Sequence, residues 1–296
     1  MKRLVWIPVL VLCMSALAQE EPQVSWQRSE PPIPAEFHLF HSDLAFNLPT
    51  AATIRKHEMQ FEIAHRFQDP IRSGHSTYYG LDSHVNMRLA LGYAVTDRLT
   101  VTAARSNAFG NVDLRLKYRF LEAPGRIPLM LAVQGGAGWN STYHDAEDGQ
   151  GGGWSGDQMQ YYGAVILNTM LGKRLGLGLV PSYVTRSDLF DPSDPHTFSM
   201  GGYAQVYLAK NFSVLAEMNH RVSGYDRGHD PVAVGFEIET GGHFFKILVT
   251  NCVYLNPSTY LAGSEFPAAD DQWRFGFILT RLLRFGDGSE EGVRQD

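Results

Sequence analysis

The stretch of sequence that decides the fold is residues 83–120, SHVNMRLALGYAVTDRLTVTAARSNAFGNVDLRLKYRF. Apolar side chains alternate along it with polar or small ones, with the period of two that marks a β-strand. In the run 112–120 one face is wholly apolar and ends in the aromatic rings of Tyr118 and Phe120. The opposite face of that run carries only charged side chains, Asp113, Arg115, Lys117 and Arg119.

Two kinds of protein produce this alternation, a soluble β-sandwich and a membrane β-barrel. A soluble sandwich buries the apolar face, whereas a membrane barrel turns it toward lipid and keeps the polar face inside. The length of the strands and their aromatic ends favour the barrel. About 9–11 tilted residues cross a bilayer, and aromatic rings collect at its two interfaces.

The N-terminus is typical of a secretory signal, with Lys2 and Arg3 before an apolar core and a cleavage site predicted after Ala18. We expect residues 19–56 to be a Pro-rich periplasmic leader that acts as a plug or docks elsewhere. The barrel is predicted over 57–286, with a polar tail over 287–296. Cys252 is the one cysteine after the signal and is interpreted as a small strand residue, so no internal disulfide is expected.

The remaining sequence repeats the alternation and predicts a single up-and-down antiparallel barrel of twelve strands. Connections after even strands are mostly short turns, and those after odd strands are mostly long and polar. Because such barrels have short periplasmic turns and longer outer loops, both termini are expected in the periplasm. The predicted location is therefore the outer membrane of a Gram-negative (diderm) bacterium.

Short motifs in the first strands resemble a known family. His65-Arg66-Phe67 is followed by Gly80-Leu81-Asp82, and Arg105-Ser106 by Asp113 and Lys117-Tyr118. Over about residues 47–120 this pattern is similar to the DUF5777 family of β-barrel outer-membrane proteins. The resemblance implies a barrel fold and an outer-membrane location. It implies no chemistry, because the family has no established activity.

The inward face of the predicted barrel is charged, and basic groups outnumber acids. One interpretation is a lumen filled by mutually neutralising pairs; the other is a pore whose basic wall favours anionic solutes. The candidate lumen-lining residues are Arg66, Arg88, Arg115, Lys117, Arg119, Arg174, Arg221, Lys246, Arg274, Glu62, Asp113, Glu217, Glu237 and Glu239.

No catalytic, cofactor or metal site is predicted. His65 and His220 lie on the outward phase, but no serine stands two residues away on the same face, as a membrane phospholipase would need. The acidic loops 140–157 and 185–196 do not match the spacing of a calcium loop, although calcium binding there is left open. No motif for nucleic acid is present.

Two functions follow as hypotheses. The first is a passive or selective pore for small polar solutes, with anionic solutes as one candidate class. The alternative is a closed structural barrel that anchors a periplasmic partner through residues 19–56. The expected partners are outer-membrane lipid and the barrel-assembly machinery, together with a small solute for the pore or a periplasmic protein for the anchor.

Overall fold

A computed structural model describes residues 40–142, 156–187, 196–224 and 228–284. The predicted signal sequence, the first part of the leader and the C-terminal tail lie outside these ranges, as do residues 143–155 and 188–195 of the two acidic loops and residues 225–227. Among the described residues, no helix has the length and apolar character needed to cross a bilayer.

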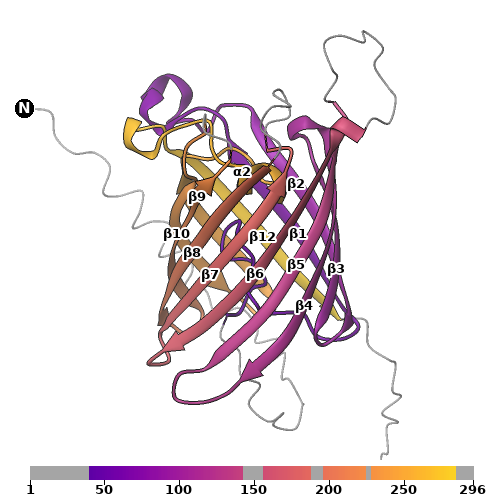
Figure 1. Ribbon diagram of the computed structural model, residues 1–296. Helices are drawn as coiled ribbons and strands as arrows, with labels where there is room; N and C mark the ends of the chain where they lie inside the picture. Colours follow the sequence, from indigo (N-terminus) through magenta and orange to yellow (C-terminus); the bar gives the residue numbers. More distant parts are fainter. Residues whose placement is uncertain (1–39, 143–155, 188–195, 225–227, 285–296) are drawn as a thin grey trace, which may run out of the picture. The chain divides into compact units, whose positions relative to one another are not determined.

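The described chain forms one closed antiparallel barrel of twelve strands, which confirms the predicted architecture (Figure 1). Each strand pairs with its neighbours in sequence, and the seam joins the first strand to the last, from Glu58↔Arg284 to Arg66↔Gly276. The strands are β1 (Glu58–Phe67), β2 (Val85–Thr96), β3 (Leu99–Ser106), β4 (Asn111–Ala123), β5 (Leu129–Asn140), β6 (Met159–Leu171), β7 (Leu175–Thr185), β8 (His196–Ala209), β9 (Phe212–Ser223), β10 (Val232–Glu239), β11 (His243–Thr250) and β12 (Arg274–Arg284).

The two faces of the wall are reversed relative to a soluble protein. Along β4, Leu114 and Leu116 are more than half exposed, whereas Arg115 and Lys117 between them are each 4% exposed. The same alternation runs along β2, from Asn86 to Ala94. Exposing apolar side chains to water is unfavourable in free energy. A continuous apolar outer surface around a polar interior therefore indicates a barrel that lies in lipid.

Loop lengths sort by end of the barrel, as the sequence predicted. The turns after even strands are short, for example 97–98 and 210–211. Loops after odd strands are longer, and 251–273 carries the helix α2 (Pro257–Ala262). The exception is 107–110, a short connection that holds the 3-10 turn η3 (Ala108–Gly110). The remaining 3-10 turns also lie in loops at this end: η2 (Ile71–Thr77), η4 (Gly156–Gln158) and η5 (Ala268–Asp270).

One strand is shorter than the sequence suggested. In the sequence, apolar residues continue through Val253 and Tyr254, but β11 ends at Thr250. Asn251 diverts the chain, because its side-chain oxygen accepts from the Val232 backbone N–H (2.7 Å) while its amide donates to the carbonyls of Asp230 and Phe266. Cys252, interpreted above as a strand residue, is therefore a buried loop residue.

Candidate functional site

The barrel interior is occupied by residues 40–56, here called the plug segment. It enters from the short-turn end, reverses direction at 45–48, and returns to join β1. The reversal is closed by the Ala45 N–H donating to the Leu48 carbonyl (2.8 Å) and the Thr50 N–H donating to the Asp43 carbonyl (2.9 Å). Part of the leader therefore lies in the lumen, one of the arrangements that the sequence had left open.

The wall leaves space for the apolar side chains of the plug segment. A Cβ on Gly176 would lie 2.8 Å from the ring of Phe40, and a Cβ on Gly201 would lie 2.8 Å from a methyl carbon of Leu48. Real Cβ atoms do not approach other atoms so closely, so a side chain at either position would have to move Phe40 or Leu48 from its place. The lumen is thus filled by the plug segment at positions where the wall itself is bare.

Glu217 of β9 holds the tip of the plug segment. Its carboxylate accepts from the backbone N–H groups of Phe46 (2.9 Å), Asn47 (3.0 Å) and Leu48 (3.0 Å). The Asn47 side-chain amide also donates to the Glu217 carboxylate (3.0 Å). Arg66 in turn donates to the side-chain oxygen of Asn47 (2.9 Å). A buried carboxylate that faces several converging N–H groups is well satisfied, so this contact fixes the tip in the lumen.

Two lysines hold the carbonyl groups of the plug segment. Lys246 of β11 donates to the carbonyls of Leu44 and Ala45 and to the Ser42 hydroxyl. Lys117 of β4 donates to the carbonyls of Asp43 (3.0 Å) and Thr50 (3.2 Å). The wall therefore binds mainly the backbone of the plug segment.

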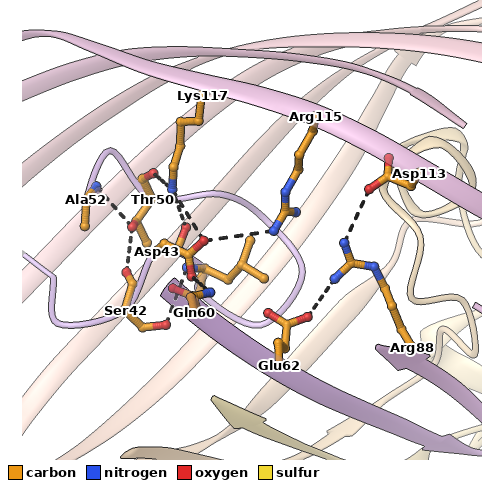
Figure 2. Close-up of polar contacts among 12 residues, drawn as sticks. Ser42, Asp43, Thr50, Ala52, Gln60, Glu62, Arg88, Asp113, Arg115 and Lys117 are labelled. Atoms are coloured by element: carbon orange, nitrogen blue, oxygen red, sulfur yellow. Dashed lines mark hydrogen bonds and ion pairs between the residues drawn. The ribbon is translucent and has the colours of Figure 1, made fainter. Parts of the chain in front are cut away.

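The Asp43 carboxylate occupies a cationic site on the wall (Figure 2). Gln60 of β1 donates to one oxygen (2.7 Å), while Lys117 Nζ and Arg115 Nη2 lie 3.7 Å and 3.9 Å from the other. Burial acts to raise the pKa of the Asp43 carboxyl, but Lys117 and Arg115 outweigh it and hold that pKa below its usual value. Among the described residues, Arg115 Nη2 has no hydrogen-bond partner.

Next to this site the wall neutralises its own charges. Figure 2 shows Arg88 of β2 between two acids, with Nη1 2.6 Å from Glu62 and Nη2 3.4 Å from Asp113. Tyr162 donates to the second Asp113 oxygen (2.6 Å). These groups belong to the wall alone, in contrast to Arg115 and Lys117, whose carboxylate partner comes from the plug segment.

The loop between β11 and β12 folds into the opposite end of the lumen. Tyr260 of α2 donates to Glu217 (2.7 Å), so the loop and the plug segment meet at one carboxylate. Asn219 of β9 donates to the Leu261 carbonyl (3.2 Å). Above the loop, a cavity of about 270 Å³ remains at the mouth, lined by Gln68, Asn86, Ala108, Phe109, Val253, Tyr254, Glu265 and Phe266.

Most of the lumen candidates named from sequence lie on the inner face of the wall. Arg119, Arg221 and Glu239 are only partly buried, near strand ends. Arg174 was misplaced: it is exposed in the β6–β7 turn, because β7 begins only at Leu175. The buried ones are Glu62, Arg66, Arg88, Asp113, Arg115, Lys117, Glu217, Glu237, Lys246 and Arg274.

Sequence reasoning missed several residues that join the plug segment to the wall. Asp43 carries the one buried carboxylate of the plug segment, residues 40–56. Nothing in the sequence indicates that this carboxylate lies next to the basic side chains of β4. Asn168, which accepts from the Ala51 N–H (2.7 Å), and Tyr203, which donates to the Pro49 carbonyl (3.1 Å), were also not singled out as contacts. The available signal was the cluster of apolar residues at 37–48 in an otherwise Pro-rich leader.

The two outward histidines have different surroundings. His65 packs edge-on against Phe277, with ring centroids 4.5 Å apart. His220 Nδ1 lies 2.7 Å from the Asp230 carboxylate, at the long-loop end. Neither of these contacts includes a serine hydroxyl. Within the described residues, no group of three or more His, Cys, Asp or Glu side chains has a metal-binding arrangement, and most of the acidic loop positions lie outside those residues.

A closed barrel with an apolar outer surface and a polar interior defines the chain as a membrane-bound β-barrel protein. It belongs to the family described as membrane bound beta barrel domain (DUF5777), whose model matches residues 40–283. That match begins at the plug segment, so both the plug segment and the barrel belong to the family domain.

Solved structures with the same type of fold have little sequence in common with the chain. The COG4313 outer membrane channel from Pseudomonas putida F1 has 13% identity and a TM-score of 0.47, over 79% of this chain and 98% of that one. The KdgM porin in complex with disordered oligogalacturonate has 8% identity and a TM-score of 0.45, over 77% and 99%. Outer membrane phospholipase A from Escherichia coli has 12% identity and a TM-score of 0.40, over 83% of this chain and 95% of that one. No curated protein matches the sequence.

Proposed function

We propose that the protein is a gated outer-membrane channel for small polar solutes, closed by the plug segment. The carrying observation is that a separate segment, residues 40–56, fills space in the interior that the wall leaves open. This segment adds no strand to the barrel, so it can leave without breaking a wall pairing. Its bonds to the wall are largely polar and can be exchanged for bonds to water.

The charge of the wall supports a preference for anions once the plug segment has moved. Departure of Asp43 removes the carboxylate that faces Arg115 and Lys117, and departure of Asn47 removes a bond from Arg66. Arg88 and Lys246 retain wall carboxylates as partners. Glu217 is the acid exposed by the same movement. The opened wall therefore gains more positive than negative charge, and charged linings set pore selectivity.

The test is conductance of the refolded full chain in a planar bilayer, with ion selectivity taken from reversal potentials. The wild type is expected to be mostly closed, with rare anion-selective openings. Asp43→Asn should open more often, and charge reversal at Arg115 and Lys117 should then weaken the anion preference. Asp82→Asn, an exposed loop position, serves as the matched control.

A folded barrel that stays silent in every plug variant would contradict the channel. That result would favour the alternative function, a closed barrel that anchors a periplasmic partner through residues 19–56. Folding is checked for each variant by the shift in electrophoretic mobility that barrels show on heating.

A further inference from the structure

We infer that Arg115, Lys117 and Gln60 form a binding site for the carboxylate group of a small organic solute, and that Asp43 fills this site while the channel is closed. The inference rests on the proposed function, because free solute reaches these residues only through an opened lumen. It adds the chemical class of the solute and the way in which the solute would act on gating.

The site has the composition of a carboxylate receptor. It combines a guanidinium and an ammonium that lie within 3.9 Å of one Asp43 carboxylate oxygen with an amide N–H that donates to the other, and all three groups are buried (Figure 2). A guanidinium matches the planar geometry of a carboxylate and binds it through parallel N–H bonds. Three wall side chains from β1 and β4 thus converge on one anionic group that is not part of the wall.

Asp43 does not use the site fully. Its carboxylate makes a hydrogen bond with Gln60 at 2.7 Å, but the nearest Arg115 nitrogen is 3.9 Å away, beyond hydrogen-bond distance. That nitrogen, Nη2, is buried and has no partner among the described residues. A buried donor without a partner carries a desolvation cost. A free carboxylate, which no backbone restrains, can move the remaining distance and bond to Arg115.

Competition for one site couples solute binding to opening. Asp43 and a solute carboxylate cannot both occupy the site, so the solute binds only the state in which the plug segment has left. A ligand that binds one of two states shifts the equilibrium toward it. At a concentration roughly ten times its dissociation constant, the ratio of open to closed channels should rise roughly tenfold.

The experiment compares acetate with chloride at equal ionic strength in the bilayer recording. We expect the open ratio, meaning the ratio of open to closed channels, to rise in the wild type as the acetate concentration increases, and then to saturate. Arg115→Lys keeps the charge but loses the planar guanidinium, so its response should need more acetate. An equal response to acetate, chloride and sulfate would overturn the inference, because it would show screening in place of carboxylate binding.

A second readout follows the plug segment directly. In a Cys13→Ser background, an Ala45→Cys variant places a thiol at a fully buried plug position. Its labelling by a water-soluble maleimide should be faster in acetate than in chloride. The native Cys252 gives little background, because burial raises the pKa of its thiol to about 12.

The outcomes separate this inference from the proposed function. If Asp43→Asn conducts and the introduced thiol is labelled, but acetate changes neither the wild-type open ratio nor its labelling, the channel stands and the carboxylate site fails. If no plug variant conducts and the thiol stays protected in all of them, the proposed channel fails and the inference fails with it.

Discussion

At the scale of single residues, Glu217 accepts more hydrogen bonds from the plug segment than any other described side chain. It accepts from three consecutive backbone N–H groups and also from Tyr260 of the opposing loop. No other described carboxylate joins the plug segment to α2. A change at this one position should therefore loosen both elements that fill the lumen.

Glu217→Gln keeps the shape of the side chain and removes its charge. Hydrogen bonds to a charged group are worth about 1.5–3 kcal/mol each, about twice those to a neutral one. Loss of that advantage should raise the open-to-closed ratio roughly 10- to 100-fold, since about 1.4 kcal/mol corresponds to tenfold. Single-channel recording measures the ratio. An unchanged ratio in a folded variant would show that Glu217 does not hold the closed state.

Gly201 offers a steric test with a close control. In Gly201→Ala the new methyl would lie 2.8 Å from a terminal methyl carbon of Leu48, so the Leu48 side chain must move from its place in the closed state and the channel should open more often. Gly202, the next residue of β8, would gain a methyl whose nearest neighbour is 3.7 Å away, an ordinary contact. Gly202→Ala should therefore behave like the wild type in the same recording. Equal behaviour of the two variants would count against the fit of the plug segment to the wall.

His41 gives gating a pH dependence. Its Nδ1 lies 2.6 Å from Glu239, its ring packs on Tyr207, and Glu237 adds a further negative charge. The bond to Glu239 raises the pKa of His41 and outweighs the effect of burial. The stabilisation of the closed state is therefore complete below the ordinary His pKa of about 6.5 and is lost as pH rises through the raised value.

The open ratio should accordingly increase as the pH on the short-turn side is raised from about 6 to about 9. His41→Gln should weaken this dependence, because the amide does not titrate. The Asp43 carboxyl does not contribute in this range, since its pKa is held below its ordinary acidic value. A pH response of unchanged size in His41→Gln would assign the effect to another group.

At the scale of elements, the loop 251–273 is held in the lumen by its first residue. Asn251 is fully buried and makes three hydrogen bonds that join the loop to 230–232 and to Phe266. Asn251→Ala leaves these partners without bonds, at a cost of about 1–3 kcal/mol for each buried group that stays unsatisfied. Chymotrypsin should then cut near Tyr254 or Tyr260 faster than in the wild type. Asp270→Ala, in an exposed part of the same loop, should not change the rate.

The strands also show which features of the fold the sequence pattern predicts and which it does not. The inward phase of β4 followed from the period-two pattern, because each strand must turn alternate side chains to lipid and to lumen. The end of β11 did not follow, since the side-chain bonds of Asn251 stop a pattern that is apolar enough to continue. Arg174 was misplaced because residues 172–174 form the turn and β7 begins only at Leu175.

The site could be predicted only from the side of the wall. Arg115, Lys117 and Glu217 were named as inward charges, but their partners were not. Glu217 binds backbone N–H groups, which every residue except proline possesses, so no sequence letter marks them. Asp43 lies more than 70 residues before Lys117, and its apolar neighbours fit several structures equally well.

At the scale of the whole molecule, the interior is filled from two ends. The plug segment enters from the short-turn end, the loop 251–273 enters from the long-loop end, and the two meet at Glu217. A channel with this arrangement has two barriers in series. Release of the plug segment alone should therefore give small openings, and Asp43→Asn combined with Asn251→Ala should give larger ones.

This combination is checked by comparing the conductance of the double variant with that of Asp43→Asn alone. The two sites share no hydrogen-bond partner, so their effects on stability should be close to additive. Equal conductance in the single and double variants would show that the loop does not restrict the opened lumen.

The position of the plug segment directly before β1 has a consequence for biogenesis. The segment must lie between strands β4, β6, β9 and β11, which are made after it, before the seam of β1 with β12 encloses it. Among the described residues, the strand pairing with the longest separation in sequence is that of the first strand with the last, and such contacts form slowly. During that delay the segment can supply hydrogen bonds to inward charges, so the nascent barrel closes around groups that are already paired.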